Sequence, residues 1–244
     1  MSQPITNYDK PRKHKINKET INYEIQDTVR RCISPLSTPE DIISSLQTII
    51  NYANECNVYD KEKDAVHVRM TFIQYLSWSI PSVCAISTIK KAVRYKSTKD
   101  NTIKSYKILS IGSGNGFWEF LLHKSGLQII ASDIKQSKTP YYDVEHLSGY
   151  DAVRKYSNYN VLFINWPSDK NKWAFTALDI FKGNIVIYIG DMHADCAADD
   201  DFYERIWTDF TIQHIELDSW RPLRDGLYIC KRKIPITRSS PISI

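Results

Sequence analysis

The chain has 244 residues, a mass of 28.3 kDa and a formal charge of +4, from 32 basic and 28 acidic side chains. Hydrophobic residues make up 42%, which is enough to bury a core and excludes a chain that is disordered throughout. No apolar run approaches the roughly 18 residues of a membrane helix, and Met1–Lys18 lacks the apolar centre of a signal peptide. We therefore expect a globular, intracellular and cytoplasmic protein without a membrane segment: one α/β domain with an appendage.

The charges are unevenly distributed along the chain. Residues 1–16 lack apolar periodicity and are expected to be a flexible basic arm, and Lys90–Lys107 holds seven Lys or Arg against one Asp. Both segments make nucleic acid a candidate partner, with a solvated helix face and a flexible linker as the alternative. The five cysteines lie far apart without a C-x-x-C pair, which favours reduced thiols over a disulfide framework or a zinc module.

Residues 17–105 are predicted to form a helical segment that ends in a linker. Apolar residues at three- and four-residue steps predict four helices, at about 17–34, 39–53, 61–79 and 82–95. Thr38 can cap the second helix, and Pro39 after it suits the first helical position. The inward face of the third helix is expected to carry Val66, Met70, Ile73 and Leu76. Lys96–Ser105 is predicted to be the linker.

After Tyr106, short apolar strands alternate with helical stretches, which predicts a doubly wound α/β domain over residues 106–233. Strands buried on both faces of a parallel sheet are predicted at Lys107–Ile111, Gln128–Ser132, Asn160–Ile164 and Asn184–Ile189. Helices are predicted at Phe117–Lys124 and at about 149–156, 170–181 and 199–210. Residues 234–244 are expected to be a tail.

The two edges of this sheet are expected to differ. Asp143–Glu145 is a weak strand candidate, so one edge strand is predicted to be short or missing. Thr211–Leu217 and Leu227–Arg232 are joined by only nine residues, too few for a helical crossover, so we expect an antiparallel pair. The predicted fold is therefore a mainly parallel, seven-stranded-type sheet that ends in an antiparallel pair and follows a helical segment.

Three of the eight glycines fall within Gly112–Gly116, between a predicted strand and a predicted helix. Glycine permits backbone angles and a close approach of ligands that a Cβ would prevent, while a tight turn is the alternative interpretation. The spacing differs from G-x-G-x-x-G, since Phe117 stands where the last glycine of a dinucleotide fingerprint would be. Asp133 closes the next strand, where a carboxylate can accept two hydrogen bonds from a ribose diol or simply be solvated.

This order of strand, G-x-G-x-G loop, helix, strand and acid resembles the class I S-adenosylmethionine-dependent methyltransferases over about residues 106–233. The family's seven-stranded sheet ends in an antiparallel pair. A narrower resemblance links the chain to an uncharacterised group of methyltransferase-like proteins with W-x-I-P and "cWP" stretches. The segments that carry it are Trp78–Ser82, Gly116–Glu119, Asn165–Pro167, Val186–Asp191 and Trp220–Arg232. The resemblance implies S-adenosylmethionine as cofactor, bound by Gly112, Ser113, Gly114, Gly116, Asp133 and Ile134.

Methyl transfer from a sulfonium mainly requires alignment of the reacting atoms and exclusion of water. The stretch Asn165-Trp166-Pro167-Ser168 is loosely similar to the N-P-P-Y motif of amino-group methyltransferases. The resemblance implies that Asn165 orients the acceptor and that Trp166 and Pro167 shape its pocket, with structural roles as the alternative. Contacts with the substrate are expected from Trp78, Phe117, Trp118 and Asp191.

Two further groups of polar residues lie near the predicted site segments in the sequence. Glu119 is expected to favour the helix N-terminus rather than to meet the amino group of a ligand. Asp191–Cys196 lacks the ligand spacing of a metal site, so no metal is predicted. The sequence thus predicts methyl transfer from S-adenosylmethionine to an unidentified acceptor, a nucleic-acid base or a small molecule. The alternatives are a catalytically inactive binding or scaffold subunit with the same fold and a nucleotide-dependent oxidoreductase.

Overall fold

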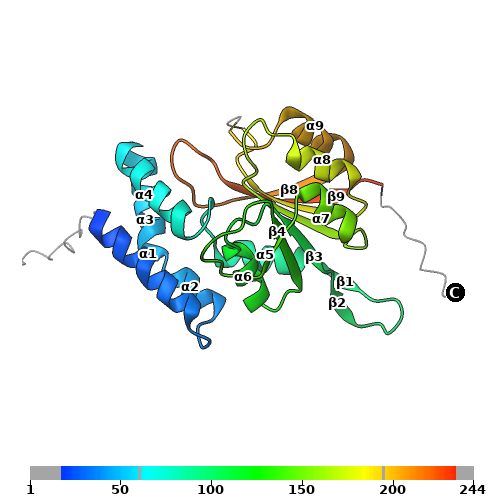
Figure 1. Cartoon of the computed structure of the whole chain (residues 1–244), viewed down its shortest axis with the longest axis horizontal. Coiled ribbons are helices and arrows are strands. Elements are labelled where there is room, and N and C mark those ends of the chain that lie inside the picture. The colour runs from blue at the N-terminus through cyan, green and yellow to red at the C-terminus, as the bar shows by residue number, and fades with distance from the viewer. Residues whose placement is uncertain (1–17, 60–61, 194–195, 235–244) are drawn as a thin grey trace, which may run out of the picture.

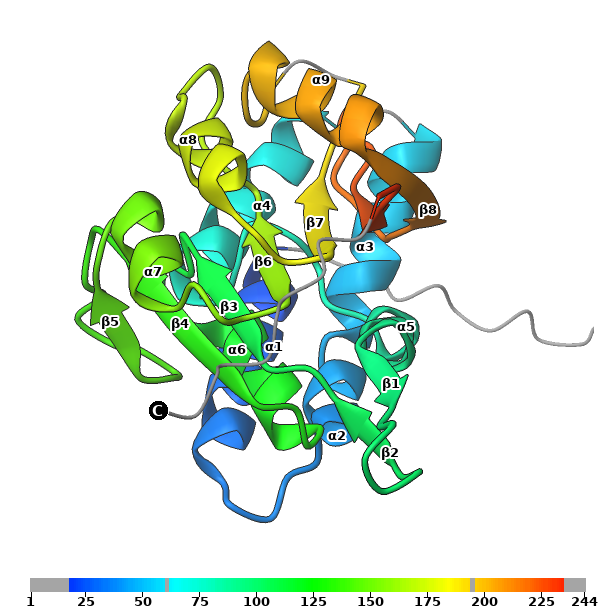
Figure 2. The same ribbon diagram turned by 90° about the vertical axis from the view of Figure 1, so that its right-hand side faces the viewer.

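A seven-stranded sheet lies between two helical layers in the computed structural model, which describes residues 18–59, 62–193 and 196–234 (Figure 1, Figure 2). The strands are β3 (Ile108–Ile111), β4 (Ile129–Asp133), β5 (Val144–His146), β6 (Val161–Asn165), β7 (Ile185–Gly190), β8 (Phe210–Glu216) and β9 (Gly226–Arg232). Their order is β5-β4-β3-β6-β7-β9-β8, parallel from β5 to β7, with β9 antiparallel to both of its neighbours. The predicted fold class is confirmed, including the short edge strand β5 and the antiparallel pair of β8 and β9.

Helices cover both faces of the sheet, which explains why the central strands are mostly apolar. Every residue of β3 and β7 is buried. One face packs against α7 (Gly149–Lys155), α8 (Trp173–Ile180) and α9 (Asp200–Asp209). The other face packs against α5 (Val83–Ala92) and α6 (Phe117–Lys124). This places the loop between β3 and α6 at the carboxyl ends of the parallel strands.

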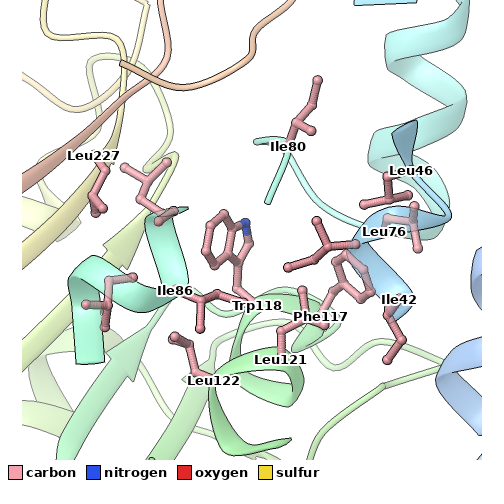
Figure 3. Close-up of a cluster of buried hydrophobic side chains, with 14 of the residues drawn as sticks. Ile42, Leu46, Leu76, Ile80, Ile86, Phe117, Trp118, Leu121, Leu122 and Leu227 are labelled. Carbon is pink, nitrogen blue, oxygen red and sulfur yellow. The ribbon is translucent and has the colours of Figure 1, made fainter. Parts of the chain in front are cut away.

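In the described part of the chain, α1 (Lys18–Ile33), α2 (Pro39–Ser44), α3 (Gln47–Tyr59) and α4 (Glu62–Tyr75) precede α5. They form a lobe beside the carboxyl ends of the strands (Figure 1). The lobe and α6 share one hydrophobic core, in which Ile42, Leu46, Leu76 and Ile80 pack with Phe117, Trp118 and Leu121 (Figure 3). No described helix combines the length and the apolar character needed to cross a bilayer.

The predicted helix over residues 39–53 is correct at its start but is two helices. Thr38 caps α2 through a reciprocal pair of hydrogen bonds with Asp41. The helix ends because the Ser45 hydroxyl donates to the Ile42 carbonyl at 2.6 Å, while the Leu46 amide bonds to residue 43 instead. A hydroxyl that competes for a helix carbonyl in this way weakens the next turn.

The predicted inward face of the third helix is wrong in two positions. Val66 and Met70 are 51% and 55% exposed, whereas Val68, Phe72 and Leu76 are buried. The interior face of α4 is set by its packing against α1, a contact that the periodicity of one helix does not reveal. The helix also ends at Tyr75 instead of near residue 79.

The predicted linker Lys96–Ser105 is wrong, because part of it is sheet. β1 (Arg94–Lys96) and β2 (Ile103–Ser105) form an antiparallel hairpin. Its turn is held by Asp100, whose carboxylate accepts hydrogen bonds from Thr102 and from Lys104. The hairpin leads into the amino end of β3, so most of the basic stretch Lys90–Lys107 lies on a folded element. The predicted arm over residues 1–16 and most of the tail lie outside the described residues.

Candidate active site

The three glycines of the loop all adopt left-handed backbone angles, with φ of +68° at Gly112, +58° at Gly114 and +75° at Gly116. A Cβ on Gly112 would lie 2.6 Å from Cη2 of Trp173, and one on Gly116 would lie 2.8 Å from Cβ of Tyr142. A Cβ on Gly114 would meet no atom within 4 Å. The outer glycines are therefore required by packing, whereas the middle glycine faces open space.

The acid predicted to bind the sugar lies directly beside this loop. The Gly114 amide donates to Oδ2 of Asp133 at 2.8 Å, and the Lys135 amide donates to Oδ1 at 2.7 Å. Each carboxylate oxygen keeps a further acceptor position, because it has two lone pairs. Ile134 follows with a side chain that is 64% exposed, and its carbonyl lies 2.9 Å from Nε2 of His146. The loop, an acceptor carboxylate and an apolar side chain thus meet at one edge.

A buried carboxyl lies beneath the loop. Glu119 is 2% exposed and accepts a hydrogen bond from Ser110 Oγ at 2.5 Å, and Ser113 Oγ in turn donates to Ser110 Oγ at 2.9 Å. Burial raises the pKa of Glu119 to about 7, although the hydrogen bond from Ser110 opposes the shift. Glu119 does lie in the first turn of α6, as predicted, but its carboxyl faces the two serines. The sequence signal for this is an acid between the apolar residues of the first two turns of α6.

One serine joins three of the segments that carry the narrower resemblance. Nε1 of Trp118 donates to Ser79 Oγ at 2.9 Å, and Ser79 Oγ donates to Oδ1 of Asn165 at 2.8 Å. Ser79 is fully buried, so a single hydroxyl fixes both the indole and the amide. This network holds Asn165 at the carboxyl end of β6. Sequence reasoning did not single out Ser79 for this role.

Trp166 belongs to a second group, made of two rings and two charges. Its backbone is left-handed, at φ +50°, and its ring stacks on Trp78 with centroids 6.0 Å apart. The guanidinium carbon of Arg69 lies 5.8 Å and 5.3 Å from the rings of Trp78 and Trp166, and Trp166 Nε1 donates to Oδ1 of Asp225 at 3.1 Å. Burial raises the pKa of Asp225 to about 7, while the charge of Arg69 opposes the shift. Neither Arg69 nor Asp225 was predicted, because each resembles an ordinary surface helix or turn residue in the sequence.

The residues expected to contact the substrate differ in exposure. Trp78 is 47% exposed, whereas Phe117 and Trp118 are buried in the core (Figure 3). Asp191 is fully buried, and its carboxylate accepts hydrogen bonds from the amides of His193 and Arg224, both at 2.8 Å. These positions favour structural roles for the three buried residues, and their contact with a substrate stays a prediction.

Clefts open at two places of the described part of the molecule that bear on ligand binding. One, of about 480 Å³, lies near Asp225 and is also lined by residues that include Asn57, His193, His214 and Arg224. The other, of about 740 Å³, lies at the amino ends of the strands beside the hairpin. Within residues 18–59, 62–193 and 196–234, no group of three His, Cys, Asp or Glu side chains is placed to hold a metal ion.

No protein-family model matches the chain, and no curated protein matches it in sequence. The chain is similar in structure to a protein of the NADB-Rossmann superfamily from Streptococcus agalactiae, with 13% identity and a TM-score of 0.43 over 65% of this chain and 72% of that one. It is similar to TrmK of M. capricolum in complex with S-adenosyl-homocysteine, with 12% identity and a TM-score of 0.41 over 66% and 73%. It is also similar to the magnesium protoporphyrin IX methyltransferase ChlM from Synechocystis PCC 6803 with bound SAM, with 10% identity and a TM-score of 0.44 over 87% and 94%. At these values the likeness is distant.

The class of fold follows from this chain's own topology. In the described residues its main sheet has the strand order β5-β4-β3-β6-β7-β9-β8, only β9 runs against the others, and its glycine loop joins β3 to α6. The chain therefore has a Rossmann-like fold of the class I methyltransferase type.

Proposed function

We propose that this protein binds S-adenosylmethionine at the Gly112–Gly116 loop and transfers the methyl group to an acceptor beside Asn165. The proposal rests on the contact between Asp133 and the loop: the Asp133 carboxylate accepts a hydrogen bond from the Gly114 amide at 2.8 Å. The two lie at the carboxyl ends of adjacent parallel strands, where ligands of open α/β sheets bind. Open space above Gly114 supports the same location.

The residues at this edge fit the chemistry of the cofactor. The amides and angles of Gly112, Ser113, Gly114 and Gly116 would shape the contact with the amino-acid end. Asp133 would accept hydrogen bonds from the ribose through its remaining lone pairs. The exposed side chain of Ile134 would pack against the adenine ring.

The cofactor supplies an activated methyl group, so the protein's own task is to position the acceptor and exclude water. Ser79 orients Asn165 by donating a hydrogen bond to its Oδ1 atom. The side-chain NH₂ group of Asn165 can then donate a hydrogen bond to the molecule that receives the methyl group. Trp78, which is 47% exposed and stacks on buried Trp166, offers an aromatic surface next to this amide group, and buried Pro167 fixes the chain that follows. These groups support a planar acceptor.

Nucleic acid is a candidate source of such an acceptor. Lys90–Lys107 continues from α5 into the hairpin at the amino ends of the strands, which is the edge opposite to Asn165. A long polyanion would have to reach from one edge to the other, whereas a small molecule would use the Asn165 edge alone. Binding of labelled RNA and DNA at two salt concentrations would separate these cases, because phosphate contacts weaken as salt rises.

The proposal is tested by calorimetry with S-adenosylhomocysteine and with NAD. We expect S-adenosylhomocysteine to bind and NAD not to bind; a preference for NAD would reject the proposal in favour of an oxidoreductase. Activity is tested by transfer of labelled methyl from S-adenosylmethionine to pools of RNA, DNA, protein and small molecules, with Asp133→Ala as the control. Binding without transfer to any pool would favour the scaffold alternative.

A further inference from the structure

Three side chains connect the protein interior with the surface of the glycine loop. Ser113 is partly exposed in the loop, and its Oγ lies 2.9 Å from Ser110 Oγ, which lies 2.5 Å from Oε1 of Glu119. Ser110 and Glu119 are 1% and 2% exposed. The two hydroxyls therefore connect, by hydrogen bonds, a carboxyl that is shielded from water to the surface where a ligand of the loop would lie.

The protonation state of Glu119 determines which group donates in each of these hydrogen bonds, because an ionised carboxylate only accepts hydrogen bonds. With Glu119 ionised, Ser110 donates to the carboxylate and Ser113 donates to Ser110. The Ser113 oxygen then presents lone pairs to the loop. When Glu119 takes up a proton from solvent, its O–H donates to Ser110 and both hydroxyl hydrogens rotate, so that Ser113 presents a donor instead.

We propose that Glu119 is a positioning residue for the cofactor: in its ionised form it fixes Ser113 as an acceptor and so selects a ligand whose end carries a charged N–H donor. S-Adenosylmethionine and S-adenosylhomocysteine carry such a donor, the ammonium of the amino-acid end. The inference rests on the proposed function and extends it by assigning the specificity of one end of the site. A charge-assisted hydrogen bond of this kind is stronger than a neutral one.

Both protonation states are within reach near neutral pH, because burial raises the pKa of Glu119 to about 7. Two other titratable groups act on this carboxyl. Asp133 at the end of β4 raises its pKa further, and Tyr142 also interacts with it electrostatically. The exposed His146 lies on the carbonyl of Ile134.

The experiment measures the affinity for two probes by calorimetry at pH 6 and pH 8. S-Adenosylhomocysteine carries the ammonium, whereas 5′-methylthioadenosine lacks the whole amino-acid end. For the wild type we expect S-adenosylhomocysteine to bind roughly five- to tenfold more tightly at pH 8, since a shift of one pKa unit on binding corresponds to a tenfold change in affinity. The affinity for 5′-methylthioadenosine should change less than twofold.

Two variants test whether this dependence passes through the chain. Glu119→Gln removes the titrating group and keeps an oxygen that can accept from Ser110, so its affinity for S-adenosylhomocysteine should no longer depend on pH. Ser113→Ala keeps Glu119 but removes the end of the chain, and it should abolish the same dependence. The variant that combines Glu119→Gln with Ser113→Ala should show the same loss of pH dependence as either single variant, because the three groups act as one unit.

The outcomes separate this inference from the proposed function. Tight binding of S-adenosylhomocysteine that is independent of pH in the wild type, or that stays equally dependent on pH in Ser113→Ala, would overturn the inference and leave the cofactor site in place. Failure of both probes to bind at either pH would overturn the proposed function and the inference with it. Thermal unfolding of each variant confirms that the compared proteins are folded.

Discussion

Replacement of Asp133 gives a direct measure of the proposed cofactor site. The carboxylate already accepts one amide on each oxygen, from Gly114 and Lys135, so two acceptor positions remain for the ribose diol. Asp133→Ala removes two hydrogen bonds to a charged group, each worth about 1.5 kcal/mol. The expected loss is about 3 kcal/mol, or roughly 150-fold weaker binding of S-adenosylhomocysteine.

Asp133→Asn is the matched variant, because it keeps the size of the side chain and one acceptor oxygen. It should weaken binding roughly tenfold, between the wild type and Asp133→Ala. The assay is calorimetry at constant pH, with urea unfolding to compare stability. Gly114 is exposed, so water can replace the lost partner of its amide and the fold should be retained. Affinities within twofold of the wild type in Asp133→Ala would refute the assigned role.

Three further predictions concern the surroundings of the site. Gly114→Ala should weaken the binding of S-adenosylhomocysteine more than tenfold and lower the free energy of unfolding in urea by about 1 kcal/mol. Gly112→Ala should mainly lower stability, because its Cβ would meet Trp173. Trp118→Phe should lower the free energy of unfolding by about 2–3 kcal/mol, since it removes buried volume and a hydrogen bond; a loss below about 1 kcal/mol would contradict this. The pKa of Asp225 is raised to about 7, so the folded state binds more protons than the unfolded state, and stability should fall as pH rises from about 4 to 7. The free energy of unfolding in urea should fall less between pH 5 and pH 7 for Asp225→Asn than for the wild type.

Much of the α/β domain could be predicted because its signals are local. Strands such as β3 and β7 are nearly continuous apolar runs, since helices cover both faces of the sheet. The glycines of the loop are concentrated because three left-handed backbone positions occur within five residues. The antiparallel end followed from the short join before β9, which cannot hold a crossover.

The N-terminal segment was predicted less well, because its details depend on distant contacts. The inward face of α4 is set by α1, and the end of α2 depends on the Ser45 hydroxyl, which also lies 2.7 Å from that of Thr28 in α1. The hairpin of β1 and β2 was missed because three-residue strands give almost no periodic signal.

The sequence by itself determined the alternation of strands and helices in the α/β domain, the glycine loop and the acid that ends β4. Only the tertiary structure decided which polar groups meet: Glu119 with the serines beneath the loop, Ser79 with Asn165, and Asp225 with Trp166. The physical reason is that hydrophobic periodicity is written along a single element, whereas a hydrogen bond between residues far apart in sequence exists only once the elements that carry them have packed.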